Sequence, residues 1–254
     1  MKELYDKTAL ITGSTSGIGR AAAIGLAKQM VKVCITGLER SLGEETAGEI
    51  EAAGGEALFV QADLRDPAAP PEIVRQTTDR WGRLDIVVNS AGLPCNKPYD
   101  RITHDEWDRL FDVNVKAAFF VVQEALPWLI QSKGVVINIS STARLINERN
   151  NLVYDTLKAA LNHMTRGLAL DLRETGVRVN AIMPGGTATP MLMRWFEQQG
   201  ITGEEAKRAY QASLREEMVA DPKRIADAIV MLAGDRASWI NSAEIPVDGG
   251  KYLG

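Results

Sequence analysis

The chain of 254 residues is 45% hydrophobic and 24% charged, with a formal net charge of −4 and a pI near 5.4, which is ordinary for a globular protein. Its acidic balance and the lack of any Lys/Arg run argue against a nucleic-acid partner or an anionic membrane surface. No segment is apolar enough for a signal peptide or a membrane span, so we expect a cytoplasmic protein whose partner is a small molecule or another protein.

Seven short apolar runs predict β-strands, and longer segments with helical periodicity separate them. Most runs are continuous Val, Ile and Leu, which is typical of strands buried on both faces. The predicted strands are residues 8–12, 31–36, 57–61, 84–89, 134–140, 177–183 and 244–247. The predicted helices are residues 17–29, 41–53, 70–80, 104–130, 152–175 and 221–233. The alternation predicts an α/β fold with a seven-stranded parallel sheet flanked by right-handed crossover helices.

Local signals place the ends of several helices. Ser41 with Glu44, and Thr103 with Glu106, fit the S/T-x-x-E capping box. Pro127 is expected to end or kink the fourth helix in its last turn.

The chain has no repeats and no linker rich in Pro, Gly or Ser, so we predict one domain over residues 1–254. Residues 184–218 depart from the strand-helix alternation and fit two short helices around a glycine-containing turn. Such insertions often cover a site, and we call this stretch the lid segment.

Cysteine and histidine are too scarce for a disulfide framework, a metal site or a Ser-His-Asp triad. Cys34 lies in an apolar run, whereas Cys95 falls in a loop that could border a ligand site or simply fill space. His104 and His163, at a helix start and in mid-helix, are expected to be structural.

The first strand ends in TGSTSGIG, residues 12–19, and a helix follows at once. Gly13, Gly17 and Gly19 would let the backbone approach a pyrophosphate at the helix N-terminus. Their spacing is Gly-x3-Gly-x-Gly rather than the common Gly-x-Gly-x2-Gly. A purely structural tight turn is the alternative, but the position after strand one favours a nucleotide.

Tyr154 and Lys158 lie four residues apart in LVYDTLKAAL, so they share one helix face. This is the one Tyr in the chain with Lys four places later. Alone, the pair is typical of a half-buried Tyr beside a Lys on a helix flank.

Several further motifs occur in a fixed order along the chain. Together with the Tyr154–Lys158 pair, they make the chain resemble the short-chain dehydrogenase/reductase family. They are TGSTSGIG, NSAG at 89–92, Asn114 in FDVNVKA, Ser141 in NISST, YDTLK at 154–158, PGGTATP at 184–190 and VDGG at 247–250. The resemblance implies a Rossmann-type doubly wound fold with a small helical substrate lid and a nicotinamide cofactor. It also implies hydride transfer between a secondary alcohol and a ketone.

The chemistry can also be built from the residues. An acid/base for this reaction should titrate near neutral pH. Lowering the pKa of a tyrosine from about 10 to about 7 takes roughly 4 kcal/mol. An ammonium about 4 Å away supplies about 1 kcal/mol in water and about 4 kcal/mol at an effective dielectric of 20. Lys158 can therefore tune Tyr154 only in a partly closed site.

We assign Tyr154 as the general acid/base and Lys158 as the group that lowers its pKa and, by resemblance, binds the nicotinamide ribose. Ser141 follows a strand and is placed to hydrogen-bond the reacting oxygen. Asn114 is either a core residue satisfied by the backbone or, by resemblance, the holder of a water in a proton relay to Lys158.

By resemblance, further residues contact the cofactor besides Tyr154 and Lys158. They are Gly13, Ser16, Gly17, Ile18, Gly19, Leu38, Asp63, Leu64, Asn89, Ala91, Gly92, Pro184, Thr187 and Thr189. For Asp63, a carboxylate that caps its own loop is the alternative.

The chain departs from the family pattern at a few positions, namely Ser90 for Asn, Arg144 for Gly, Thr187 for Ile or Val and Ser242 for Gly. Arg144 and Arg149 either lie in a solvated loop or point at the substrate, which would then be acidic or polyhydroxylated.

Cofactor choice is weakly marked by TGLERS at 36–41. Gly37 stands where an Asp would bind the NAD ribose, and Leu38 where an Arg often binds the NADP phosphate. Glu39 would repel that phosphate and Arg40 could reach it. The absent carboxylate favours NADP slightly over NAD.

The helices at 104–130 and 152–175 carry apolar residues on more than one face, which predicts a homodimer or homotetramer.

For the function we expect an NAD(P)-dependent alcohol dehydrogenase or carbonyl reductase. Apolar Met191, Leu192, Met193 and Trp195 favour a 3-oxoacyl substrate, and the polar 144–151 loop favours a sugar or polyol. The alternatives are a non-catalytic nucleotide-sensing or scaffold protein and a lyase or epimerase.

Overall fold

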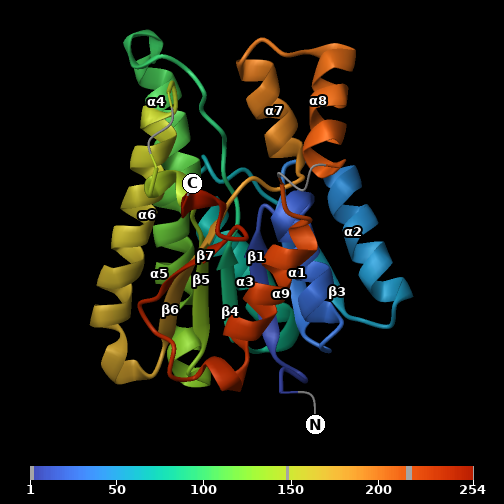
Figure 1. The fold of residues 1–254 in the computed structure, drawn as a ribbon. Helices are drawn as coiled ribbons and strands as arrows, with labels where there is room; N and C mark the ends of the chain where they lie inside the picture. Colours follow the sequence, from blue (N-terminus) through green and yellow to red (C-terminus); the bar gives the residue numbers. More distant parts are fainter. Residues whose placement is uncertain (1–2, 147–148, 216–218, 254) are drawn as a thin grey trace.

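The computed structural model describes residues 3–146, 149–215 and 219–253, and its centre is one parallel sheet (Figure 1). All seven predicted strands are present, in the order β3-β2-β1-β4-β5-β6-β7. Their bounds are β1 Thr8–Thr12, β2 Lys32–Gly37, β3 Ala57–Gln61, β4 Ile86–Asn89, β5 Val135–Ile139, β6 Arg178–Pro184 and β7 Glu244–Val247. Since the order reverses between β1 and β4, a crevice forms beyond the carboxyl ends of these strands.

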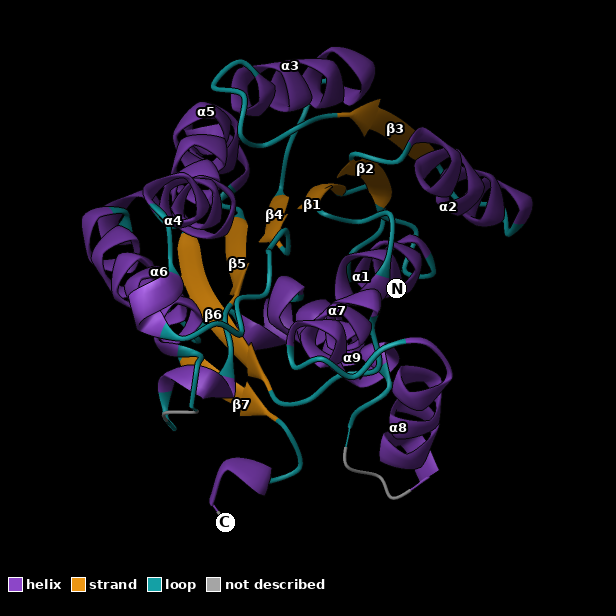
Figure 2. Cartoon of the chain, turned by 90° about the horizontal axis from the view of Figure 1, so that it is seen from above, coloured by secondary structure: helices purple, strands orange, loops and turns teal. Residues whose placement is uncertain are grey.

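Helices cover both faces of the sheet, which gives the doubly wound architecture (Figure 2). One face carries α1 Gly17–Ala27, α2 Arg40–Ala52 and α9 Pro222–Ala233. The other carries α3 Ala69–Trp81, α5 Ala117–Ser132 and α6 Leu152–Asp171. A shorter helix, α4 His104–Phe111, precedes α5. The predicted α/β class is confirmed.

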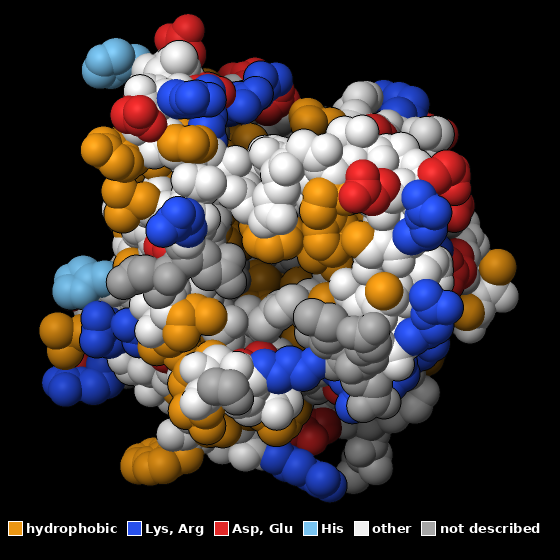
Figure 3. Space-filling model, turned by 45° about the horizontal axis from the view of Figure 1, so that its top comes forward, with side chains coloured by type: hydrophobic (Ala, Val, Ile, Leu, Met, Phe, Trp, Pro, Cys, Tyr) orange, Lys and Arg blue, Asp and Glu red, His pale blue; other side chains and the backbone are white. Residues whose placement is uncertain are grey.

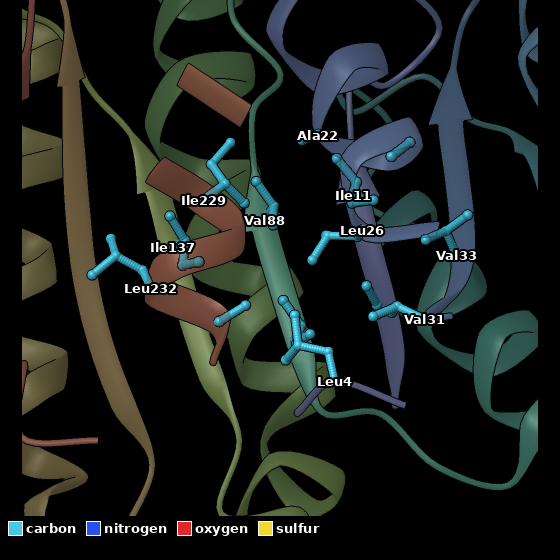
Figure 4. Close-up of a cluster of buried hydrophobic side chains, with 14 of the residues drawn as sticks. Leu4, Ile11, Ala22, Leu26, Val31, Val33, Val88, Ile137, Ile229 and Leu232 are labelled. Atoms are coloured by element: carbon cyan, nitrogen blue, oxygen red, sulfur yellow. The ribbon is translucent and has the colours of Figure 1, made fainter. Parts of the chain in front are cut away.

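The core consists of two layers, because successive side chains of a strand point to opposite faces. In β1, Ala9 and Ile11 pack into the cluster beneath α1 and α9, part of which is drawn in Figure 4. Leu10 between them packs into the cluster beneath α3, α5 and α6. Each fully buried Ile or Leu contributes about 1.5–3 kcal/mol, so the strands are fixed in register by both layers.

Helix ends agree with the sequence in part. Thr103 and Glu106 form the predicted capping box at α4. The box predicted at Ser41 is wrong, because α2 already begins at Arg40 after the extended Glu39, which makes no side-chain cap bond. Of the two outcomes expected at Pro127, an end of the helix is wrong, because α5 continues to Ser132 with Pro127 inside it.

The predicted helix 104–130 is interrupted elsewhere. A π-helical turn, Asp112–Lys116, joins α4 to α5 and contains Asn114. Such turns are rare and often lie at functional sites. The helical run His104–Ser132 is also the one helix among the described residues that is long and apolar enough to span a membrane. It packs against α3 and β4, and a core helix of a sheet protein has the same composition.

The lid segment has the predicted form over its described part. Helices α7 Pro190–Gln198 and α8 Gly203–Arg215 flank a turn with positive φ at Gly200 and Gly203, and residues 216–218 lie outside the described chain. At its base, Ala220 N donates to Gly186 O at 2.8 Å and Ala188 N donates to Ala220 O at 2.9 Å. The two strands of chain that carry the lid are thus held together.

Candidate active site

A cavity of about 760 Å³ opens at the carboxyl ends of the strands, beneath the lid segment. Figure 3 shows the hollow on this face, with hydrophobic side chains around it. The predicted site residues that line the cavity are Gly13, Ser16, Gly17, Ile18, Gly19, Leu38, Asp63, Leu64, Ala91, Gly92, Ser141, Tyr154, Lys158, Pro184, Thr187 and Thr189. Asn89 and Asn114 are not part of its lining.

The glycine turn between β1 and α1 has no room for side chains. Gly13 has φ +62°, and a Cβ there would lie 2.7 Å from Ala91 Cα. A Cβ on Gly19 would overlap the carbonyl oxygen of Gly13. The turn and the loop after β4 therefore pack backbone against backbone, and Thr12 Oγ1 fixes that loop by accepting from Ser90 N and Ala91 N at 3.1 Å.

The N-terminus of α1 is suited to an anion. Ser16 holds the extended N-cap conformation but makes no side-chain cap bond. The first N–H groups of the helix are thereby left without side-chain acceptors beside a glycine-lined cavity. These features fit the pyrophosphate of a dinucleotide.

Lys158 is almost completely buried, with 3% of its surface exposed. Its Nζ donates to Ile139 O at 2.9 Å and lies 5.5 Å from the centroid of the Tyr154 ring. Burial lowers the pKa of Lys158 to about 8. The predicted pair is thus brought together in a shielded place.

Ser141 lies two residues beyond β5 and its Oγ accepts from Ala143 N at 3.1 Å. A hydroxyl that accepts from the protein keeps its own hydrogen for another acceptor, here an oxygen in the cavity. The residues on either side tether this loop, since Ser140 Oγ donates to Lys158 O at 3.1 Å and Thr142 Oγ1 to Pro184 O at 3.3 Å.

Asn114 is buried behind the cavity wall and is held by backbone groups. Its Nδ2 donates to Leu110 O at 2.9 Å and to Leu93 O at 3.3 Å, and its Oδ1 accepts from Leu93 N at 3.3 Å. Gly92 separates it from the lysine, because a Cβ on Gly92 would lie 2.9 Å from Asn114 Oδ1 and 3.6 Å from Lys158 Nζ.

The side chain of Asn89 lies outside the cavity lining. As the last residue of β4 it points into the sheet, where Nδ2 donates to Asn138 Oδ1 at 2.9 Å. The alternation of side chains along a strand decides this orientation. Its backbone position still sets the start of the loop that carries Ala91 and Gly92.

Asp63 lines the cavity after β3 and also caps its own loop, as the alternative interpretation held. Its carboxylate accepts from the backbone N and from Nε of Arg65 at 3.0 Å. The hydrogen bond from the Arg65 side chain lowers the pKa of Asp63, so this group stays ionised at neutral pH.

The idea that Arg144 and Arg149 face the substrate is not supported. Arg144 pairs with Glu244 on β7, which also contacts Arg166, and it does not line the cavity. Arg149 is exposed, and residues 147–148 of the same loop lie outside the described chain. The loop thus directs its Arg144 charge towards a strand carboxylate rather than a ligand.

At the end of β2, the cavity is lined by Gly37, Leu38 and Glu39. A Cβ on Gly37 would lie 2.5 Å from the Thr15 side chain, so Thr15 fills the space in which a carboxylate at position 37 would begin. Arg40 lies outside the lining, 3.4 Å from Glu44 in an exposed ion pair.

The substrate half of the cavity has an apolar wall that the sequence identified only in part. Its members are Leu93, Cys95, Val113, Ile146, Met191, Leu192, Trp195 and Phe196, while Met193 is not among them. Burial raises the pKa of the Cys95 thiol. Arg109, Asn151 and Arg194 also line the cavity, and motif reasoning did not single them out. Helical spacing from Tyr154 was the available signal for Asn151.

The lid reaches across the cavity to the opposite wall. Gln198, at the end of α7, accepts through Oε1 from Asn96 N at 2.8 Å. The rings of Trp195 and Phe196 contact each other edge to face at 5.7 Å between centroids. The lid thus borders the same cavity that Tyr154 and Lys158 line.

Comparison with known proteins adds a family and relatives. The family model for short chain dehydrogenases matches residues 7–200. The chain is 32% identical to 2,5-dichloro-2,5-cyclohexadiene-1,4-diol dehydrogenase of Sphingobium indicum, covering 99% of this chain and 98% of that protein. It is 31% identical to cyclopentanol dehydrogenase of Comamonas sp., covering 98% of each.

A solved structure is similar over its full length. It is a candidate NAD(P)-dependent gluconate 5-dehydrogenase from Beutenbergia cavernae with bound NADP at low occupancy. The TM-score is 0.88 at 29% identity, covering 100% of this chain and 99% of the other. The sheet order, the glycine turn and these matches together show that the chain belongs to the short-chain dehydrogenase/reductase family of oxidoreductases.

Proposed function

We propose that the protein is an NAD(P)-dependent dehydrogenase of secondary alcohols, or reductase of the corresponding ketones, with Tyr154 as the general acid/base. The observation that carries the proposal is the buried ammonium of Lys158, 5.5 Å from the Tyr154 ring in a covered cavity lined also by Ser141. This meets the condition of shielding that the electrostatic argument sets for the pair.

The cavity fits a nicotinamide dinucleotide. The glycine turn and the uncapped N-terminus of α1 would hold the pyrophosphate, and Asp63 with its loop would border the adenine end. Thr187 and Thr189, beyond β6, would border the nicotinamide. The bound cofactor supplies or accepts the hydride.

Side chains of the protein transfer the proton and orient the reacting oxygen. In alcohol oxidation, Tyr154 takes the hydroxyl proton as the carbon loses hydride, and in ketone reduction it returns a proton to the oxygen. The positive charge of Lys158 favours the ionised phenol. Ser141 donates to the reacting oxygen and so fixes its place beside the tyrosine.

The apolar wall supports a small substrate with a hydrocarbon ring or chain. Relatives named for cyclopentanol and for a cyclohexadiene diol favour a cyclic secondary alcohol within that class. Acyl thioesters and polyols are the alternative substrates. Both cofactors stay in the proposal, because Glu39 opposes a 2′-phosphate while Gly37 offers no carboxylate to a free ribose.

The test follows nicotinamide absorbance with NAD and NADP against cyclic alcohols, cyclic diols, polyols, hydroxy acids, steroids and acyl thioesters. We expect turnover of at least one cyclic secondary alcohol. Tight cofactor binding with no turnover across the panel would instead support the non-catalytic nucleotide-sensing alternative.

We also propose a homodimer or homotetramer assembled through α5 and α6. Large apolar side chains stand exposed on these helices, including Phe119, Phe120 and Ile130 on α5 and Leu152 and Leu170 on α6. Exposed apolar surface of this kind marks interaction sites. Sedimentation equilibrium is the test, and a stable monomer would contradict the proposal.

A further inference from the structure

Asn151 is the N-cap residue of α6, three residues before Tyr154, and has no role in the mechanism above. It lines the cavity, yet only 4% of its surface is exposed. Its Nδ2 donates to Asp155 Oδ1 at 2.6 Å, and Asp155 is buried as well. A buried carboxyl group therefore holds, from behind, an amide that lines the active-site cavity.

The pair fixes which end of the amide faces the cavity. The NH2 group of Asn151 donates to Asp155, and its carbonyl oxygen therefore turns away from that carboxyl group. At the N-cap position, an Asn oxygen usually accepts from the first turn of its own helix. Asn151 makes no such bond, because its side chain is directed to Asp155 instead.

The carbonyl oxygen of Asn151 has no hydrogen-bond donor within residues 3–146, 149–215 and 219–253. Oδ1 is not among the enclosed polar atoms without partners. Since the side chain lines the cavity, the open side of this oxygen is the cavity itself. Asn151 and Tyr154 both line this cavity, so the acceptor and the phenol belong to the same site.

We propose that Asn151 is a specificity-determining residue that accepts a hydrogen bond from a second hydroxyl of the substrate. The preferred substrates are then diols and hydroxyketones rather than alcohols with a single hydroxyl. This inference rests on the proposed dehydrogenase function and narrows its substrate class. Substrates that lack the donor leave a buried acceptor unpaired, which is the basis of strong discrimination.

The experiment compares kcat/KM for cyclohexanol with that for cyclohexane-1,2-diols and cyclohexane-1,4-diols, in the wild type and in Asn151→Leu. We expect the wild type to prefer a diol, and the variant to lower the diol-to-cyclohexanol ratio about 10- to 100-fold. Cyclohexanol turnover should fall less than diol turnover, because cyclohexanol has no second hydroxyl to donate to the amide oxygen.

Two further variants separate specificity from structure. Asp155→Asn allows the Asn151 amide to take either orientation, so the ratio should fall while the fold persists. Thr156 lies on the same helix, is exposed to solvent and is outside the cavity lining. Thr156→Ala is therefore the control and should leave the ratio unchanged.

The outcomes are distinguishable. An equal loss on both substrate types in Asn151→Leu, no change in the ratio, or a wild type that shows no diol preference overturns the role of Asn151 but leaves the dehydrogenase function standing. Bound cofactor with no oxidation of any of these alcohols overturns the proposed function, and this inference with it.

Discussion

The ammonium of Lys158 lies 5.5 Å from the centre of the Tyr154 ring, within the range of a cation-π contact. Burial is the cause that brings the pKa of Lys158 to about 8. The fold therefore holds a cation in a place where being charged is unfavourable. Such strain is typical of a functional site rather than of a structural pair.

The free energy of unfolding of the wild type should depend on pH through Lys158, and the Lys158→Met variant should lack this dependence. The folded pKa of about 8 lies below the ordinary 10.5, so the unfolded chain binds more protons between these values. The charge of Lys158 therefore destabilises the wild type fully below about pH 8, and the destabilisation disappears as pH rises towards 10.5. The wild type should gain up to about 3 kcal/mol across this window relative to the variant. Urea unfolding of both proteins at pH 7 to 10 measures the difference, and parallel curves would refute the prediction.

Gly92→Ala should damage the site from within. The added methyl group would lie 2.9 Å from Asn114 Oδ1, so the Asn114 amide must move, and it would contact Lys158 Nζ at 3.6 Å. We expect kcat/KM to fall at least tenfold and the free energy of unfolding to drop by about 1–3 kcal/mol. Gly167→Ala on α6 is the matched control, since nothing lies within 4 Å of its Cβ position. That control should keep full activity and gain about 0.5–1 kcal/mol. Equal activity of the two variants would contradict the prediction.

Gln198→Ala should loosen the cover of the cavity. The change removes the acceptor of the 2.8 Å bond from Asn96 N and with it the link between α7 and the opposite wall. Because the link holds the closed form, KM for the alcohol should rise several-fold while cofactor affinity stays constant. Gln199→Ala, the exposed neighbour, serves as the control in steady-state kinetics. Unchanged KM in Gln198→Ala would mean that the lid does not depend on this contact.

Glu39→Gln should shift cofactor preference towards NADP. Glu39 lines the cavity beside Gly37, and its negative charge repels a 2′-phosphate on the ribose. We expect the ratio of kcat/KM for NADP over NAD to rise about three- to tenfold, and more at low ionic strength. Arg40→Ala tests the positive charge next to Glu39. If Arg40 leaves its exposed ion pair with Glu44 to bind the 2′-phosphate, the variant should lower activity with NADP but not with NAD. An unchanged ratio in Glu39→Gln would place the phosphate elsewhere.

The fold was predictable from the sequence because strands buried on both faces leave continuous apolar runs, as in β4 and β5. The glycine turn was predictable for a similar reason, since its positions tolerate no side chain. What the sequence could not supply was orientation. Asn89 ends the strand it was assigned to, but strand alternation turns its amide to Asn138 and away from the cavity.

Contacts between residues far apart in the sequence could not be predicted either. Arg144 looked like a cation at the substrate mouth, but its partner Glu244 lies 100 residues away on β7. Ser242, where the family commonly has glycine, adopts a left-handed φ of +63°, the conformation that explains the usual residue. The role of Asn151 depends on Asp155, and helical spacing alone does not say which groups are buried together.

The most direct test of the account is Tyr154→Phe, measured for both turnover and cofactor binding. The variant keeps the ring beside Lys158 and removes only the hydroxyl that carries the proton. We expect kcat to fall about 10²- to 10⁴-fold at every pH while the dissociation constant of the cofactor changes less than about threefold. Turnover close to the wild-type rate, with the cofactor bound, would contradict the assignment of Tyr154 as the acid/base.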